Sequence, residues 1–354
     1  MSNERIGYID AMRGLTMILV VYSHVCNYCL GDAWMGGNRV LFLLRLPCFF
    51  FISGWLFEHP GRIWSRLTVH KVVSRKFMVQ IVPTFVFLLL LVVVHDGQSL
   101  MVFFSRFGAT KGGYWFTFAL FEFFVLTIFC ERFLRGWGGA FALFISVAAF
   151  CYDALYSRLT IHLPPSTIHL MGFLSFMTWR YFLFFWLGTW AKRHFSAFIR
   201  WTDRWWVVAA VVAGFVSVAL IPHTDNLFSE YFIFAVGGIL GMTMVFTLFR
   251  RLSPSTIHHP LSTIHHSPLQ FIGRRTLDIY LLHYFFLPRF LLPYGERLRA
   301  IGSLPLEMLT AMAVAVAVVA LTLGVSYVIR LSPFLGHYLF GASLNNNRIK
   351  ESTQ

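Results

Sequence analysis

The sequence predicts an all-α protein, a polytopic transmembrane bundle of about ten helices. The first observation is composition: 57% of the 354 residues are hydrophobic and only 12% are charged, whereas charged residues make up about 25% of soluble domains. The second is a series of long apolar segments, many close to the ~20 residues that one bilayer crossing requires. The third is that Lys and Arg gather in alternate loops between those segments. An ordinary soluble domain is therefore excluded.

Ten apolar segments follow one another along the chain. They cover residues 8–29, 40–57, 77–95, 114–131, 138–156, 172–190, 205–222, 231–249, 276–293 and 306–330. The second is short, and the sixth contains Arg180. Residues 98–110 are apolar but too few to cross, so we expect them to lie in the membrane interface. The spans use up most of the chain, which leaves no room for a separate soluble domain.

The basic residues predict the orientation. If the N-terminus is cytoplasmic, most of the 29 Lys and Arg residues lie on the cytoplasmic side, as the positive-inside rule requires. Both termini are then cytoplasmic, and His24 lies in the outer half of its helix. The net charge of +14 follows from basic loops that face anionic lipid, so no nucleic-acid partner is expected. We expect a multi-pass protein of the cell (inner) membrane.

The chain divides into a transmembrane domain, residues 1–335, and a polar cytoplasmic tail, residues 336–354. Two further patterns resemble metal or redox motifs, but neither predicts a metal site. Cys26 and Cys29 lack a second cysteine pair to complete a zinc site, so packing is the simpler interpretation. The Ser-Thr-Ile-His repeat at 255–266 separates its histidine pairs by a proline and gives them no fixed ligand geometry. We interpret it as a duplicated insertion in a loop.

The first apolar segment carries three ionisable side chains, Asp10, Arg13 and His24. Arg13 and His24 are eleven residues apart, which is close to three whole helical turns, so both lie on one stripe about 16 Å apart along the axis. Asp10 precedes Arg13 by three residues and is its neighbour on nearly the same stripe. An ionisable group at membrane depth costs roughly 2.5–3.5 kcal/mol or more, so it is a functional candidate by default. The alternative is a structural role against a partner helix.

Polar groups interrupt two further segments, and each has a packing alternative. Ser53 and Gly54 are small residues in an aromatic helix, where they allow a close helix approach; direct chemistry by Ser53 lacks an adjacent base. Glu122 lies at a depth comparable with that of His24. A carboxylate beside His24 would hold its tautomer and stabilise the imidazolium, whereas the structural alternative is an ion pair with Arg180.

Two other stretches are candidates for substrate contact. Arg75 and Lys76 end a basic cytoplasmic loop, where a phosphorylated ligand from inside would meet their field first. The alternative is that they only determine topology. Segment 276–293 adds Tyr280 and His283 to a buried helix, and hydrogen bonding between helices is the alternative there.

These residues together resemble the membrane acyltransferase family 3. The motifs that carry the resemblance are Asp10-x-x-Arg13, the Arg-x10-His spacing that ends at His24, Phe50-Phe-Ile-Ser53-Gly54, Pro83 after a basic stretch, Tyr114-Trp115-Phe116, and Leu277-x-Ile-Tyr280-x-x-His283. The resemblance runs from residue 8 to about residue 330. The family often has a basic-x-x-basic pair before the proline, but here Val79 follows Lys76 by three residues. The histidine-rich repeat is not part of the family pattern.

The resemblance implies an enzyme that acylates cell-surface or extracellular carbohydrates. The donor would be cytoplasmic acyl-CoA, with acetyl-CoA the expected form, and the acceptor a sugar hydroxyl on the far side. The Arg and His of the first helix would be essential. No bound cofactor and no metal are implied.

The sequence thus predicts an integral membrane O-acyltransferase with His24 as general base. Arg13 would steady the donor or the acyl oxygen as charge develops, Asp10 would orient Arg13, and Glu122 would orient His24. The residues expected to contact substrate are Arg75, Lys76, Ser53, Trp115, Arg180, Tyr280 and His283. The alternative is a transporter or exporter of glycans that uses the same buried charges as a relay; matching broken helices in two halves would favour it, and no such symmetry is visible.

Overall fold

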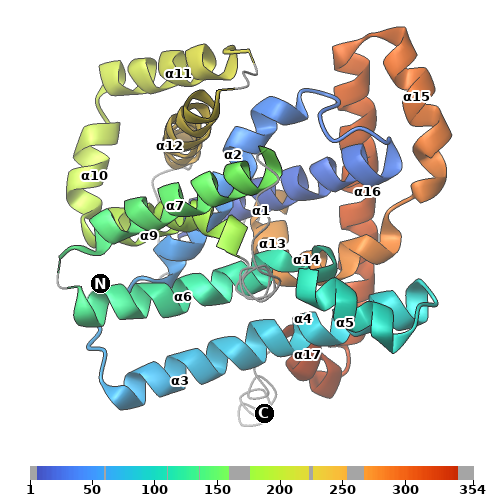
Figure 1. Ribbon diagram of the computed structural model, residues 1–354, viewed down its shortest axis with the longest axis horizontal. Helices are drawn as coiled ribbons and strands as arrows, with labels where there is room; N and C mark the ends of the chain where they lie inside the picture. Colours follow the sequence, from blue (N-terminus) through green and yellow to red (C-terminus); the bar gives the residue numbers. More distant parts are fainter. Residues whose placement is uncertain are drawn as a thin grey trace, which may run out of the picture.

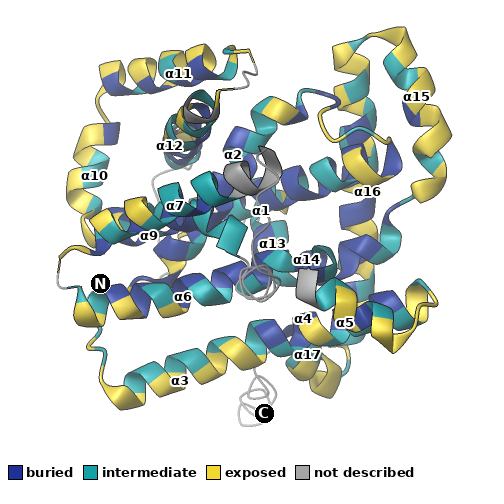
Figure 2. Ribbon diagram, viewed as in Figure 1, coloured by how far each residue is buried: buried dark blue, intermediate teal, exposed yellow. Residues whose placement is uncertain are grey.

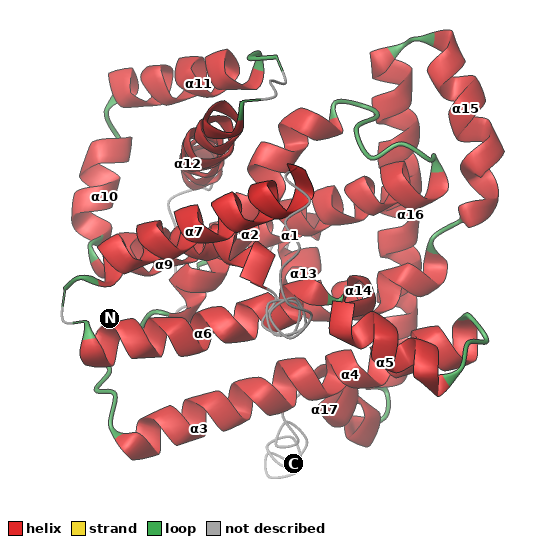
Figure 3. Cartoon of the chain, in the orientation of Figure 1, coloured by secondary structure: helices red, strands yellow, loops and turns green. Residues whose placement is uncertain are grey.

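A computed structural model of the chain describes residues 6–59, 61–109, 111–134, 136–158, 176–222, 226–252 and 267–341. Within these ranges the chain forms helices joined by turns and loops, with no strand (Figure 3). The predicted all-α fold is therefore confirmed.

Helix α1 (Gly7–His24) lies in the middle of the molecule (Figure 1). It packs against α2, α12, α13, α14 and α16. In the most apolar 18-residue window of Gly7–Cys29, 78% is buried, compared with 28% in that of Leu304–Arg330. The helix with the candidate residues is thus an interior helix, whereas α16 is peripheral (Figure 2).

The other elements of the first half surround α1. They are η1 (Val25–Cys29), α2 (Asn38–Phe57), α3 (Arg66–Lys76), η2 (Phe77–Ile81), α4 (Val82–Leu89), η3 (Leu90–His95), α5 (Leu100–Ala109), η4 (Lys111–Gly113), α6 (Trp115–Phe133) and α7 (Gly138–Arg158). From α3 to η3 the chain is one nearly continuous helix with two π-helical stretches. It runs beside α6 in Figure 1, and α3 and η2 both contact α6.

The second half is more broken. It contains η5 (Phe176–Tyr181), α9 (Phe182–Arg193), α10 (Phe195–Thr202), α11 (Trp205–Ala219), α12 (Leu227–Leu252), α13 (Pro268–Arg274), α14 (Thr276–Leu282), η6 (His283–Phe286), η7 (Arg289–Leu291), α15 (Leu292–Ile301), α16 (Leu304–Arg330) and α17 (Pro333–Phe340). The predicted segment 276–293 is not one helix, because the chain leaves helical geometry around Pro288.

Several helices are long and apolar enough to cross a membrane. Among the described residues these are Gly7–Cys29, Asn38–Phe57, Arg66–His95, Ser229–Leu252 and Leu304–Arg330. The pair α10 and α11, bent by 80°, adds a sixth if it is one span. The chain is therefore a multi-pass membrane protein. The count falls below ten because α6 carries three charged residues and α9 has only 12 residues.

Glycines let the central helices approach closely. A Cβ at Gly54 of α2 would collide with the Phe185 carbonyl of α9, and a Cβ at Gly188 of α9 would collide with the Phe51 carbonyl of α2. This reciprocal contact confirms the close approach predicted for Gly54. Gly14 of α1 meets the backbone of α13 in the same way, which fixes α13 against the helix that carries Arg13.

The predicted division at residue 335 lies inside α17. Phe340 is only 4% exposed and stacks on Phe87 of α4, with ring centroids 5.8 Å apart. The packed helical body thus continues to Phe340. Residues 342–354, and the histidine-rich repeat at 255–266, lie outside the described residues.

Candidate active site

His24 is the last residue of α1, and the π-turn η1 follows directly. Such π-turns are rare and frequently occur at functional sites. The His24 ring stacks at 17° on the ring of Tyr28, with centroids 5.6 Å apart, and lies 5.0 Å from the ring of His283. Its Nε2 lies 3.4 Å from the Tyr284 hydroxyl. Because His24 is half-buried and Tyr28 is exposed, the ring lies where the core meets the surface.

Two backbone carbonyls fix the protonation of the His283 ring. The residue is fully buried, and its Nδ1 lies 2.8 Å from the Tyr280 carbonyl and 3.1 Å from the Ile279 carbonyl. A carbonyl only accepts, so Nδ1 carries the proton and donates. Nε2 is then an acceptor, and within the described part of the chain it has no hydrogen-bond partner. The structure therefore brings His283, a predicted substrate residue, next to His24.

Tyr284 connects the His24 ring to the turn that precedes α6. Its hydroxyl donates to the Gly113 carbonyl at 3.2 Å and lies 3.4 Å from His24 Nε2. Gly113 has a φ of +90°, and a Cβ there would lie 2.7 Å from the Tyr284 hydroxyl oxygen. The turn thus requires glycine for its conformation and for the close approach of Tyr284.

Two more tyrosines fix this turn to α14. The Tyr114 hydroxyl donates to the Leu281 carbonyl at 2.7 Å, and the Phe116 N–H donates to the Tyr280 hydroxyl at 3.1 Å. Tyr280 was predicted as a substrate residue. Its hydroxyl instead caps the start of α6, which holds the turn at Gly113 in place.

Arg45 is a functional candidate that the sequence analysis missed. It lies on α2, is 9% exposed, and donates from Nη1 to the Asn38 side-chain oxygen at 2.5 Å. Its guanidinium is close enough to His24 for its charge to act on the imidazole. The position of Arg45 inside the apolar segment 40–57 was the available signal.

The other end of the α1 stripe has a different set of partners. Arg13 Nη2 donates to the Thr276 hydroxyl at 2.6 Å. Asp10, which is buried, accepts from Nε of Arg274 at 3.1 Å. The carboxylate of Asp10 is thus engaged with α13, and the orientation of Arg13 by Asp10 stays a prediction. Both side chains join α1 to the α13–α14 segment.

A group of cations gathers near Arg13. Lys76 is half-buried, and its ammonium lies 4.4 Å from the centroid of the Phe124 ring. The charges of Arg13, Arg75 and Arg62 all act on it. Arg75 is exposed. The structure thus brings Lys76 close enough to Arg13 for their charges to interact, a proximity that the sequence did not predict, and leaves Arg75 exposed at the rim of this group.

His59 lies at the edge of the same group, beyond the end of α2. Burial, and then the positive charges of Arg62, Lys192 and Lys76, hold the pKa of His59 below its usual value. Burial makes the largest contribution to this lower pKa, and the three nearby cations add to it. The cytoplasmic mouth predicted here is therefore a positive field.

Glu122 lies away from His24. Its carboxylate accepts from Nε1 of Trp179 at 2.7 Å and interacts with the charge of Lys111. Among the described residues the structure gives it no contact with His24, so the predicted role as its orienting partner is not supported by the geometry. The predicted alternative partner, Arg180, has its guanidinium over the Tyr181 ring, 5.3 Å from its centroid.

Trp115 and Arg180 belong to one aromatic layer. Trp115 stacks on Tyr181 at 22°, with centroids 6.0 Å apart, and Arg180 covers the same tyrosine. Ser53 is separate from this layer. Its hydroxyl donates to the Phe49 carbonyl of its own helix at 2.8 Å, a common way for a helical serine to satisfy its hydroxyl.

Asp278 is a structural ion-pair residue. It is 1% exposed and accepts from Nε and Nη2 of Arg330 at 2.7 and 2.8 Å, and from Ser326 at 2.5 Å. This two-point contact joins α14 to α16. It satisfies a carboxylate that would otherwise be costly inside the membrane.

The fold and the site define a helical membrane enzyme. His24 lies at one end of its central helix α1, and a cation cluster lies near the other end. The family model described as the acyltransferase domain matches residues 6–331, so the chain belongs to acyltransferase family 3. It is accordingly a membrane-bound acyltransferase that transfers groups other than aminoacyl groups. Neither the curated proteins nor the solved structures contain a match to it.

Proposed function

We propose that this acyltransferase moves an acyl group, acetyl in the expected case, from cytoplasmic acyl-CoA to a hydroxyl of a cell-surface or exported carbohydrate at the inner membrane. One observation carries the proposal: a single buried helix bears Arg13 in a cation cluster and His24 in a polar cluster. The eleven residues between them span about 16 Å. A donor from one side and an acceptor from the other would meet along this helix.

The cation cluster supports a phosphorylated donor. Arg13, Lys76 and Arg62 repel one another, and such a cluster is stabilised when anionic phosphates enter it. Arg75 at the rim would attract the ligand first. Val79 contributes no charge at the family's second basic position, and Arg13 and Arg62, whose charges act on Lys76, would supply that contact from other elements.

The acceptor site centres on the free nitrogen of His24. The one hydroxyl proton of Tyr284 is engaged with the Gly113 carbonyl, so the hydroxyl oxygen accepts from Nε2–H of His24. Nδ1 of His24 is then the unprotonated nitrogen and the base. In the proposed step, Nδ1 takes the proton of the acceptor hydroxyl while its oxygen attacks the thioester carbonyl carbon. The C–S bond breaks, and the CoA thiolate leaves with the proton that the imidazolium returns.

Arg45 and Arg13 would each stabilise negative charge on a different part of the substrates. Arg13 lies about 16 Å along the helix from His24, too far to contact the same reacting atoms. We assign Arg13 to the donor, and Arg45, whose charge acts on His24, to the acyl oxygen on which negative charge develops. His283 Nε2 would accept a hydrogen bond from the acceptor sugar. Trp115 and Arg180, which both contact Tyr181, would contact the remainder of the glycan.

The test is transfer of labelled acetyl from acetyl-CoA to membrane glycan by properly inserted variants. His24→Ala should reduce transfer by about 10²–10⁴-fold, the usual contribution of a positioned acid–base group. Arg13→Ala should weaken donor binding and so reduce transfer at limiting acetyl-CoA. His70→Ala, which removes an exposed histidine, is the matched control and should retain normal transfer. Normal activity in His24→Ala or Arg13→Ala would remove the proposed mechanism.

A further inference from the structure

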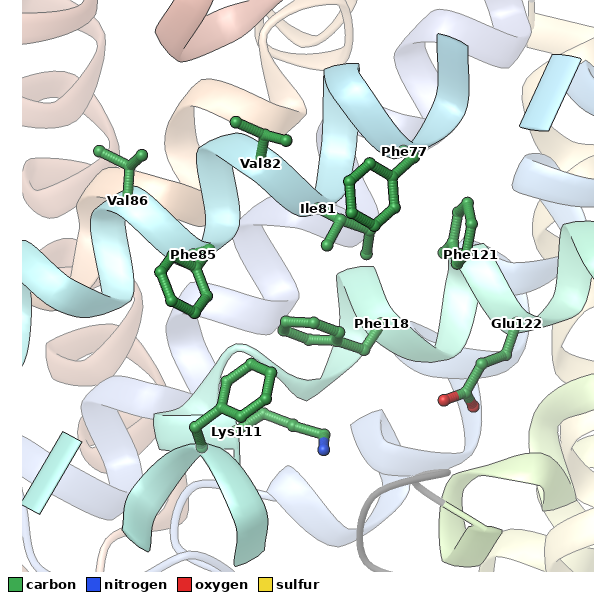
Figure 4. A pocket seen from close by; sticks show the side chains of 10 residues that line it. Phe77, Ile81, Val82, Phe85, Val86, Lys111, Phe118, Phe121 and Glu122 are labelled. Carbon is green, nitrogen blue, oxygen red and sulfur yellow. The ribbon is translucent and has the colours of Figure 1, made fainter. Parts of the chain in front are cut away.

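A cavity of about 550 Å³ lies between α4, α5 and α6, separate from the His24 cluster. Its lining comes from Phe77, Ile81, Val82, Phe85, Val86, Phe107, Lys111, Phe118, Phe121 and Glu122. Figure 4 shows the phenylalanine rings of its wall around one space, with Phe77 and Phe121 toward one end and Phe85 toward the other. A cavity of this volume and this apolar lining is of the size that holds a small ligand.

The rim of the cavity faces the bilayer. Phe77 is 44% exposed and Phe85 is 39% exposed, and both belong to the stretch Arg66–His95, which is apolar enough to cross the membrane. At that depth the surrounding medium is hydrocarbon, so a chain of a membrane lipid can enter from the side without passing through water.

The wall of the cavity is shaped by irregular helix. Phe77 and Ile81 begin and end the π-helical turn η2, and Pro83 follows within the first turn of α4. A π-helical turn is wider than an α-helical one and is often found at functional sites. Phe77 and Ile81 of this turn both line the cavity.

Two charged side chains lie at this otherwise apolar cavity. Lys111 is only 2% exposed and holds a left-handed φ of +52°, which is unfavourable for a lysine. Its ammonium lies 4.9 Å and 5.6 Å from the ring centroids of Phe107 and Phe118. In Figure 4 the ammonium of Lys111 and the carboxylate of Glu122 extend toward the same region, and each acts on the charge of the other.

The cavity connects to the His24 cluster through a three-residue turn. Lys111 begins η4, which ends at Gly113, and the Gly113 carbonyl accepts from the Tyr284 hydroxyl beside His24. One short turn therefore borders the cavity at Lys111 and holds Tyr284 beside His24 at Gly113.

We propose that this cavity holds one hydrocarbon chain of the acceptor, which is a lipid-anchored carbohydrate rather than a free glycan. This proposal rests on the proposed function. With the orientation that Lys and Arg predict, Lys111 lies toward the outer face and Phe77, which follows Lys76, lies toward the cytoplasmic side. A lipid of the outer leaflet would lie in the cavity with its polar linkage at Lys111 and its hydrocarbon chain toward Phe77. Its sugar would lie at His24.

The first test measures occupancy of the cavity. The full-length protein is placed in phosphatidylethanolamine vesicles that contain a polyisoprenyl phosphate with a diazirine in its chain, and the photolabelled residues are mapped by mass spectrometry. Label is expected on α4 and α6 residues of the cavity. Val86→Trp, which fills the cavity, should lose this label, whereas Val94→Trp, at an exposed position on the same stretch, should keep it. Equal labelling of the cavity in both variants would overturn the proposal.

The second test measures transfer to two acceptors, a polyisoprenyl-linked saccharide and the same saccharide without lipid. Val86→Trp should reduce transfer to the lipid-linked acceptor about tenfold or more and leave transfer to the free saccharide unchanged. Equal effects on both acceptors, or no effect, would overturn the proposal. Val86→Phe, a smaller change, replaces Val86→Trp if that variant does not fold. If wild-type protein acylates neither acceptor, the proposed function fails, while photolabelling still decides whether a chain occupies the cavity.

Discussion

Tyr284 has one proton and two neighbours, and the choice between them determines which nitrogen of His24 is basic. The hydroxyl lies 3.2 Å from the Gly113 carbonyl and 3.4 Å from His24 Nε2. Because the carbonyl has no proton to give, the hydroxyl donates to it and accepts from Nε2–H. The side chain therefore acts on the tautomer of His24 rather than on the substrate, which is a positioning role.

Tyr284→Phe tests this role. Removal of the hydroxyl frees His24 to exchange tautomers, so kcat should fall by about tenfold while KM for acetyl-CoA stays the same. Histidine nitrogen NMR shifts should show that the Nδ1–H form of His24 has become populated. Tyr294→Phe, at an exposed position on α15, is the matched control. An unchanged tautomer in Tyr284→Phe would contradict the assignment.

His59 provides a second test at the scale of one residue. Burial and the charges of Arg62, Lys192 and Lys76 hold the pKa of His59 low. CoA phosphates in this field would offset those charges, so binding should raise the pKa. By linkage, CoA should bind more tightly as the pH falls through the pKa of His59.

The measurement is a histidine NMR titration of the protein with and without saturating CoA. Adenosine, which has no phosphate, is the control ligand and should leave the titration of His59 where it was. If CoA also leaves it unchanged, the phosphates bind elsewhere.

At the scale of the helix, the crossing of α2 and α9 holds the core of the molecule together. Gly54 and Gly188 each face a backbone carbonyl of the other helix, so neither position has room for a methyl group. Because α2 also carries Arg45, the same crossing sets how close that guanidinium lies to His24. The packing here therefore affects the site as well as stability.

Gly54→Ala should destabilise the protein by about 1–3 kcal/mol, the usual effect of overpacking a core. The measurement is thermal unfolding of the purified protein in detergent. Gly324→Ala is the matched control, because it also replaces a helical glycine but has nothing within 4 Å of the added Cβ. It should be neutral or stabilise by up to ~1 kcal/mol through helix propensity. Equal unfolding temperatures for both variants would contradict the proposed packing.

The sequence predicted the helices and the residues that share a helix face better than the tertiary contacts of individual side chains. The stripe of Arg13 and His24 depends only on helical period, so it could be predicted, and both residues lie in one continuous helix. Asp10 pairs with Arg274, 264 positions away, and no local pattern reports such a contact. Similarly, the partner of Glu122 is Trp179, in a segment whose placement depends on tertiary packing.

At the scale of the whole molecule, two clusters of side chains lie at opposite ends of α1. Cations gather around Lys76 near one end, and the rings of His24, His283 and Tyr284 gather at the other. Family membership shows that the chain transfers acyl groups. The positions of the two clusters are the basis for the proposed direction of transfer across the membrane. Under the proposed function, the donor would enter from the side of Lys76 and the acceptor from the side of His24.

The most direct measurement of this claim is acyl transfer in sealed vesicles of known orientation. Labelled acetyl-CoA and the acceptor saccharide are supplied separately to each face of wild-type and His24→Ala protein. We expect transfer by the wild-type protein only when acetyl-CoA is on the face that carries Lys76 and the acceptor is on the face that carries His24. We expect no transfer by His24→Ala. Transfer with both substrates confined to one face, or transfer by His24→Ala at the wild-type rate, would contradict this claim.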